Sequence, residues 1–267
     1  MTAGDEDALE RLLDRIEELD QHGNAAALRR EVLRGRGRFP ESIDLMEWEA
    51  MLASEGGEHG RALELLDAVL ARAPRRFWPR RERAAVLLDV GRFEEALAAL
   101  DDTLAAARLR DAEERASLHH DRGLCLDRLG RTEEADRAFT RAATLCPDDF
   151  FVPLRLSGEE FDTLVERALD HIPKRFRKYL QQTIVTVDDY PPADVDDPFV
   201  LGVYHGVPRP HRHAAGKDDP DTVVVFKRSH EVACRDRARL EDEVLRTVVH
   251  EIAHHFGIEH DDMGDFL

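Results

Sequence analysis

The sequence is short of cysteine, of aromatic residues and of long hydrophobic runs, and each shortage excludes a class of protein. Its three cysteines are odd in number and widely spaced in 267 residues: Cys125, Cys146 and Cys234. They do not supply a disulfide framework, so we expect reduced thiols and a cytoplasmic location. No apolar stretch approaches the roughly 20 residues that a membrane span needs, and the acidic first residues do not resemble a secretory signal.

Positive charge is also scarce, with 38 basic against 56 acidic side chains and a net charge of −18. An acidic chain is a poor partner for phosphates, so neither nucleic acid nor an anionic membrane is expected to bind. The few lysines, moreover, all lie after residue 150, while the first half uses arginine alone. This shift in composition indicates two domains, which we place at residues 1–148 and 149–267.

The first half is built from a repeat. Four glycines mark it, the first three 34 residues apart and the last 39 residues further on: Gly23, Gly57, Gly91 and Gly130. Alanines follow the last three glycines by five residues: Ala62, Ala96 and Ala135. Prolines follow three of the glycines by 17 residues: Pro40, Pro74 and Pro147. The spacing predicts units of one helix, a tight turn at the glycine, and a second helix that ends before the proline.

This array resembles the tetratricopeptide repeat over about residues 9–148, in four units. The last unit matches best, with Gly123, Gly130, Ala135, Phe139, Ala142 and Pro147. A polar insertion around Arg108–Ser117 accounts for the longer last step. The resemblance implies an all-α solenoid with a groove for a peptide or a protein partner. A structural spacer or an oligomerisation module is the alternative.

The second half reads as a small α+β domain. A serine N-cap at Ser157 and an apolar stripe predict a helix that ends at Pro173. Runs rich in β-branched residues predict strands over residues 183–187, 200–204 and 222–226, the last apolar enough to be central in a mixed sheet. A long helix is expected over residues 239–256, ended by Gly257.

That last helix carries the strongest motif of the chain. His250 and His254 stand four residues apart, so both imidazoles fall on one face and can reach one ion. Gly257 permits the chain to turn back, which brings His260 into position as a third ligand. Glu251 projects beside them as a general base. The sequence therefore predicts a zinc ion held by His250, His254 and His260, with Glu251 catalytic.

The string H-E-x-x-H-x-x-G-x-x-H resembles the metzincin-type signature of zinc peptidases. Residues 158–267 resemble the small bacterial zincin-like metallopeptidases, or minimal zincins, also at Leu201–Gly206 and Val223–Arg228. That family usually has an acidic residue where His260 stands, but the spacing from the glycine favours His260 over Asp261. Tyr204 is a candidate oxyanion stabiliser, with cross-strand packing as its alternative role.

Three functions fit these observations. The first is a zinc-dependent peptidase whose repeats recruit a protein partner or a peptide substrate. The second is a proteolytically inactive, zinc-binding adaptor in which the repeats carry the function. The third is a metal-dependent hydrolase of another substrate. Glu251 favours an active enzyme, because a scaffold has no need of it. The strand edge that pairs with substrate lies in residues 199–206 or 222–228.

Overall fold

The computed structural model describes residues 3–106, 111–172, 180, 183–193, 195–206 and 221–256. They divide into two compact units, Met1–Ala138 and Phe139–Leu267. This division falls inside a helix, whereas the domain boundary expected from the sequence, between residues 148 and 149, lies just after the end of that helix. The position at which the chain can be cut into two folding parts therefore stays a prediction.

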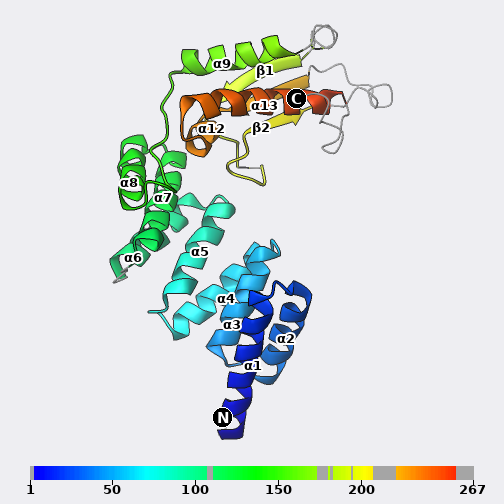
Figure 1. The fold of residues 1–267 in the computed structure, drawn as a ribbon, viewed down its shortest axis with the longest axis vertical. Helices are drawn as coiled ribbons and strands as arrows, with labels where there is room; N and C mark the ends of the chain where they lie inside the picture. Colours follow the sequence, from blue (N-terminus) through cyan, green and yellow to red (C-terminus); the bar gives the residue numbers. More distant parts are fainter. Residues whose placement is uncertain are drawn as a thin grey trace. The chain divides into compact units, whose positions relative to one another are not determined.

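Up to residue 145, every element in the described part of the chain is a helix (Figure 1). In chain order they are α1 (Ala3–Gln21), α2 (Ala25–Arg38), α3 (Ile43–Glu55), α4 (His59–Arg72), α5 (Phe77–Asp89), α6 (Phe93–Ala106), α7 (Ala112–Arg128) and α8 (Thr132–Leu145). Of the insertion expected around Arg108–Ser117, Asp111 caps α7 and residues 112–117 form its first turns, while residues 107–110 lie outside the described chain. The predicted helical array is confirmed.

The four repeat glycines make the turns that their spacing predicts. Gly23, Gly57, Gly91 and Gly130 have φ values of +65°, +71°, +72° and +72°, and no other described residue has a positive φ. At each turn the next residue donates its N–H to the carbonyl five positions back, as Arg92 does to Leu87 at 2.8 Å. This left-handed helix cap strains any residue with a Cβ, which is why glycine recurs.

Small side chains and prolines shape the rest of the array. Alanines at the predicted helix crossings are at most 1% exposed: Ala50, Ala62, Ala84, Ala96 and Ala135. Because they carry only a methyl group, paired helices such as α3 and α4 can pack closely. The repeat prolines each stand two residues beyond a helix end: Pro40, Pro74 and Pro147. The helices thus begin and end where the repeat predicts.

The second unit contains a small mixed sheet and helices packed on it. Its further elements are α9 (Gly158–His171), β1 (Thr183–Asp188), β2 (Gly202–His205), β3 (Asp221–Phe226), α12 (Lys227–Ala233) and α13 (Arg237–His255). The described strands are ordered β1-β3-β2, with β1 parallel and β2 antiparallel to β3. The expected strands and their central member are confirmed, whereas α12 was not predicted.

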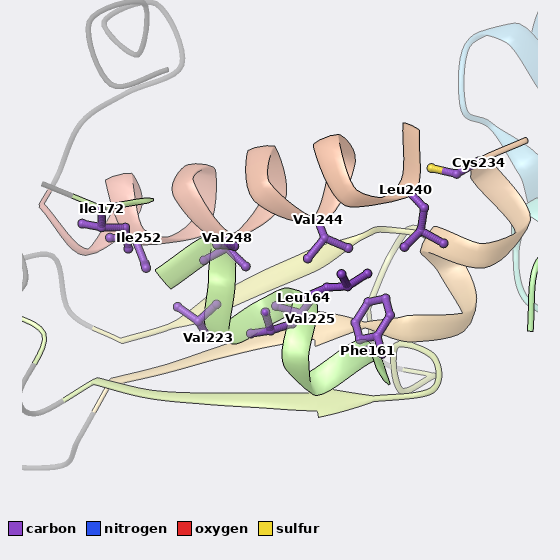
Figure 2. Packing of buried hydrophobic residues seen from close by; sticks show 12 residues of the cluster. Phe161, Leu164, Ile172, Val223, Val225, Cys234, Leu240, Val244, Val248 and Ile252 are labelled. Atoms are coloured by element: carbon purple, nitrogen blue, oxygen red, sulfur yellow. The ribbon is translucent and has the colours of Figure 1, made fainter. Parts of the chain in front are cut away.

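Two helices cover one face of this sheet. Figure 2 shows Leu240, Val244, Val248 and Ile252 in a row along α13, facing α9 and β3. Their spacing of four residues keeps them on one side of the helix. From the other side of this core come Phe161 and Leu164 of α9 with Val223 and Val225 of β3. A capping box, in which Ser157 and Glu160 bond each other's backbone N–H, starts α9 as expected.

The unpredicted helix α12 is held by a buried carboxylate. Glu231 is fully buried and accepts a hydrogen bond from the backbone N–H of Leu156 at 2.8 Å. Its second partner is the Lys227 ammonium group at 3.0 Å. Cys125 and Cys234 are buried free thiols. None of the described helices is both long and apolar enough to cross a membrane.

Candidate metal centre

The motif helix α13 owes its orientation to its N-cap and to its apolar row. The Asp236 side chain accepts a hydrogen bond from the backbone N–H of Arg239 at 2.9 Å and so starts the helix. Because the apolar row faces α9 and β3, the rotation of the helix about its axis is fixed. His250 and His254 consequently lie on a half-buried side of α13, next to the core rather than within it.

The two motif histidines point at the same place. Their Nε2 atoms are 3.2 Å apart, and their rings are perpendicular with centroids 4.8 Å apart. Two imidazole ligands at the usual zinc–nitrogen distance of about 2.0–2.1 Å and a tetrahedral angle have nitrogens about 3.3 Å apart. The distance between the two Nε2 atoms therefore matches that between two ligands of one tetrahedral zinc ion.

Glu251 lies on the next side of the helix and is only 8% exposed. Burial raises the pKa of its carboxyl group to about 7, although a hydrogen bond from the backbone N–H of Tyr204 acts in the opposite direction. That bond joins the motif helix to β2. The Glu251 carboxyl group thus lies next to the backbone of β2, and it stands one residue from a candidate zinc ligand.

A glycine lets β2 come this close to α13. A Cβ at Gly202 would lie 2.7 Å from Thr247 Cγ2 and 3.0 Å from Glu251 Cγ, so no larger residue fits without displacement. Gly202 is a site residue that was not predicted from the sequence. The available signal was a lone glycine within a strand, which often marks a close approach of two backbones.

The sheet order narrows the choice of substrate edge. Since β3 lies between β1 and β2, residues 222–226 cannot offer a free edge. β2 pairs with β3 on one side, and no described strand pairs with its other side. Of the two segments that the sequence left open, residues 199–206 therefore contain the candidate edge.

A cavity of about 380 Å³ lies beside this edge. Its apolar walls are Phe199, Val200, Leu201, Val249 and Ala253, and its polar lining includes His250 and Glu251. Three further charged side chains line it: Asp197, Glu243 and Arg246. The motif face of α13 thus opens into a hollow whose size is in the range of small-ligand sites.

A buried histidine outside the motif is hydrogen-bonded to Thr247 of α13, which lines the cavity. His230 of α12 is fully buried, with Nδ1 2.8 Å from the Phe226 carbonyl oxygen and Nε2 3.0 Å from the Thr247 hydroxyl. Because a carbonyl only accepts, Nδ1 carries the proton and Nε2 accepts from Thr247. Burial lowers the pKa of His230 to about 4, so it is neutral at pH 7. His230, like Gly202, was not predicted from the sequence.

Of the remaining predicted site residues, some lie outside the described chain and one, Tyr204, packs on the core. His260 and Gly257 lie outside the described residues, and the described part of the chain contains no group of three or more potential metal ligands. Tyr204 is opposite Val223 and packs on the core; a Cβ at Gly206 would lie 2.4 Å from its hydroxyl oxygen. The structure thus brings together His250, His254 and Glu251, with the Tyr204 backbone beside them.

Comparisons with known proteins agree with both units. Residues 180–266 match the family model of the zincin-like metallopeptidases, and residues 75–148 match a tetratricopeptide-repeat model. The chain therefore carries tetratricopeptide repeats followed by a zincin-like domain. No curated protein matches it.

Solved structures similar to the chain include MamA proteins. MamA from Desulfovibrio magneticus RS-1 is 22% identical at a TM-score of 0.46, covering 52% of this chain and 76% of its own. A MamA AMB-1 structure is 22% identical at a TM-score of 0.45, covering 51% of this chain and 78% of its own.

Proposed function

Because a zincin-like domain follows tetratricopeptide repeats in this chain, we propose that the protein is a zinc-dependent peptidase whose repeat unit recruits a protein partner or substrate. The observation that carries this proposal is the convergence of the His250 and His254 Nε2 atoms, 3.2 Å apart, beside the Glu251 carboxylate. These two histidines would hold the zinc ion, with His260 as the proposed third ligand. The repeats support the recruiting role, since such arrays present surfaces for protein binding.

Zinc held by these histidines would supply Lewis acidity, which would polarise the scissile carbonyl and lower the pKa of water. The Glu251 carboxylate takes a proton from the attacking water and passes it to the nitrogen of the leaving amine. The Tyr204 backbone N–H beside this carboxyl group lowers its pKa, against the larger effect of burial. Tyr204 remains the proposed oxyanion stabiliser.

We further propose that substrate binds as an extended strand along β2. β2 is an outermost strand of the described sheet, so an extended substrate could lie along its outer side as a further strand. The adjoining cavity has apolar walls at Phe199 and Val200, which suit an apolar side chain of the substrate. The free thiols are consistent with the cytoplasmic location that we propose for the protein.

Replacing Glu251 with glutamine tests this function. Glu251→Gln keeps the shape of the side chain but cannot accept the proton, so cleavage of a peptide library should fall by ~10²-fold or more while zinc stays bound. Asp242→Asn, on an exposed part of the same helix, is the matched control and should keep full activity.

Three outcomes would contradict the assignment. Equal cleavage by Glu251→Gln and the unchanged protein would remove Glu251 as the base. A zinc-loaded protein that cleaves no member of the library, but binds a partner through its repeats, would establish the inactive adaptor instead. Hydrolysis of non-peptide substrates alone would favour the third function.

A further inference from the structure

A second cavity lies in the first unit, away from the metal motif. It has a volume of about 520 Å³ and is lined from α1, α3 and α5, the first helices of three successive pairs. Its walls include both tryptophans of the chain and three carboxylates: Trp48, Trp78, Met51, Glu17, Asp44 and Glu47. We call this cavity the tryptophan hollow.

The spacing of residues on α3 explains how the hollow forms. Asp44, Glu47, Trp48 and Met51 follow one another at steps of three, one and three residues, which places them on one side of the helix. Leu45, about 100° round the helix from Asp44, is buried in the core. Trp48 and Met51 pack against that core and stay partly exposed. Trp78 is also partly exposed and packs against the next hydrophobic cluster of the array.

Negative charge in the hollow exceeds the positive charge next to it. The Arg76 Nη1 atom lies 2.7 Å from Asp44 Oδ1 and 2.8 Å from Glu47 Oε1, so one guanidinium serves two carboxylates. Burial nevertheless raises the pKa of Glu47, against the effect of Arg76. Glu17, on α1, is an exposed third carboxylate. A further cation entering the hollow would relieve this imbalance.

We propose that the tryptophan hollow binds an arginine or lysine side chain from an extended, basic segment of a partner protein. Trp48 and Trp78 line the hollow, and the face of an indole ring attracts a cation, with which the carboxylates can pair. The aliphatic stem of such a side chain packs on Met51. An acidic segment is excluded, because it would meet Glu17 and Glu47 and a chain of net charge −18.

This inference names the kind of partner for the recruiting role proposed above, and it rests on that role. Its test measures binding alone, in full-length protein carrying Glu251→Gln. If the protein binds no zinc or cleaves no peptide, the binding measurement still tests the tryptophan hollow. If the basic segment does not bind, the proposed peptidase activity is not contradicted.

Tryptophan fluorescence reports directly on the hollow, since it contains both tryptophans of the chain. The probe is a short acetylated and amidated peptide in which alanine alternates with arginine. A peptide with citrulline in place of arginine has the same shape without charge. We expect a saturable fluorescence change with the arginine peptide and at least tenfold weaker binding of the citrulline peptide.

Charge variants locate the binding. Glu17→Lys reverses an exposed charge in the hollow, while Glu94→Lys reverses an exposed charge on α6 outside it. The first should abolish saturable binding and the second should change affinity less than about twofold. Trp78→Leu, which keeps an apolar side chain, should weaken binding by about 5- to 30-fold, the worth of one cation–π contact. If Trp78→Leu disturbs folding, the Glu17→Lys variant, at an exposed residue, still tests whether the arginine peptide binds in the hollow.

Three results would overturn the proposal. The first is the absence of saturable binding by the arginine peptide. The second is equal affinity for the arginine and citrulline peptides, which would mean that the hollow does not recognise charge. The third is an equal loss in Glu17→Lys and Glu94→Lys, which would mean that the net charge of the chain attracts the peptide without a defined site.

Discussion

At the scale of single residues, His230 shows how the motif helix is supported from outside the motif. It links the Phe226 carbonyl at the end of β3 to the Thr247 hydroxyl, one turn before the first motif histidine. The bond to the Phe226 carbonyl requires a proton on Nδ1, and because burial keeps the ring neutral at pH 7, Nε2 accepts from the Thr247 hydroxyl. Protonation of Nε2 would turn the acceptor of the Thr247 bond into a second donor.

The lowered pKa of His230 predicts a loss of stability in acid. The unfolded chain binds a proton at this residue below its ordinary pKa of about 6.5, whereas the folded protein resists protonation down to a pKa of about 4. Between these values the unfolded state holds more protons, so the free energy of unfolding falls as the pH falls. The loss contributed by this residue is about 3 kcal/mol across the window.

Urea titrations followed by circular dichroism, at about pH 7 and about pH 5, measure this effect. His230→Gln should lose less stability than the unchanged protein between the two pH values. His171→Gln, at an exposed histidine on α9, should behave like the unchanged protein. The same acid sensitivity in His230→Gln would show that another group causes it.

The sequence predicts some of these residues and not others for a physical reason. His250, Glu251 and His254 are close in the chain, so helix geometry alone brings the histidines together. His230 and Thr247 are 17 residues apart, and their bond exists only after α12 and α13 have packed. No local pattern encodes that contact.

At the scale of elements, the approach of β2 to α13 decides where the candidate edge lies. Gly202 permits it, since Thr247 and Glu251 occupy the space that a side chain would need. The register is also fixed, with Gly202 opposite Val225 and Tyr204 opposite Val223. The strand and the motif helix therefore form one rigid wall of the cavity.

Adding a methyl group at Gly202 should disturb this wall. Gly202→Ala should lower the free energy of unfolding by about 1–3 kcal/mol, because a buried threonine and Glu251 must move. Denaturant titration measures the loss. The matched control is Gly158→Ala at the start of α9, where a Cβ meets nothing within 4 Å and the stability should stay equal or rise slightly. Equal stability of both variants would contradict the close approach.

The elements differ in how well the sequence predicts them. β1 and β3 are rich in β-branched residues, and the alternating pattern of β1 and the continuous apolar pattern of β3 predict their places. α12 has seven residues and follows β3 without a break, so it has neither the length nor the cap of a predictable helix. Which strand forms the edge depends on strand order, which is not a local property.

At the scale of the whole molecule, the repeat array should be stable without the second unit. The repeat array relies on contacts between neighbouring helix pairs, so a fragment of residues 1–148 should fold by itself. Circular dichroism should show a helical protein with a cooperative thermal transition. A fragment of residues 1–138 should melt at a lower temperature, because it lacks the fully buried Phe139 and Ala142 of α8.

This pair of fragments tests the predicted domain boundary. The longer fragment loses the hydrogen bonds that Arg235 donates to the carbonyl oxygens of Pro147 and Asp148, but these lie beyond the end of α8. An unfolded 1–148 fragment would contradict the boundary and would mean that the repeats need the zincin-like domain as a cap.

The central claim is that α13 supplies a zinc centre, and the zinc content of the purified full-length chain tests it most directly. Elemental mass spectrometry of protein prepared without chelator should find about one zinc ion per chain, retained in Glu251→Gln and lost in His250→Ala or His254→Ala. His260→Ala should weaken binding severely and Asp261→Ala hardly at all. An unchanged protein that contains no zinc and takes up none on titration would contradict the claim.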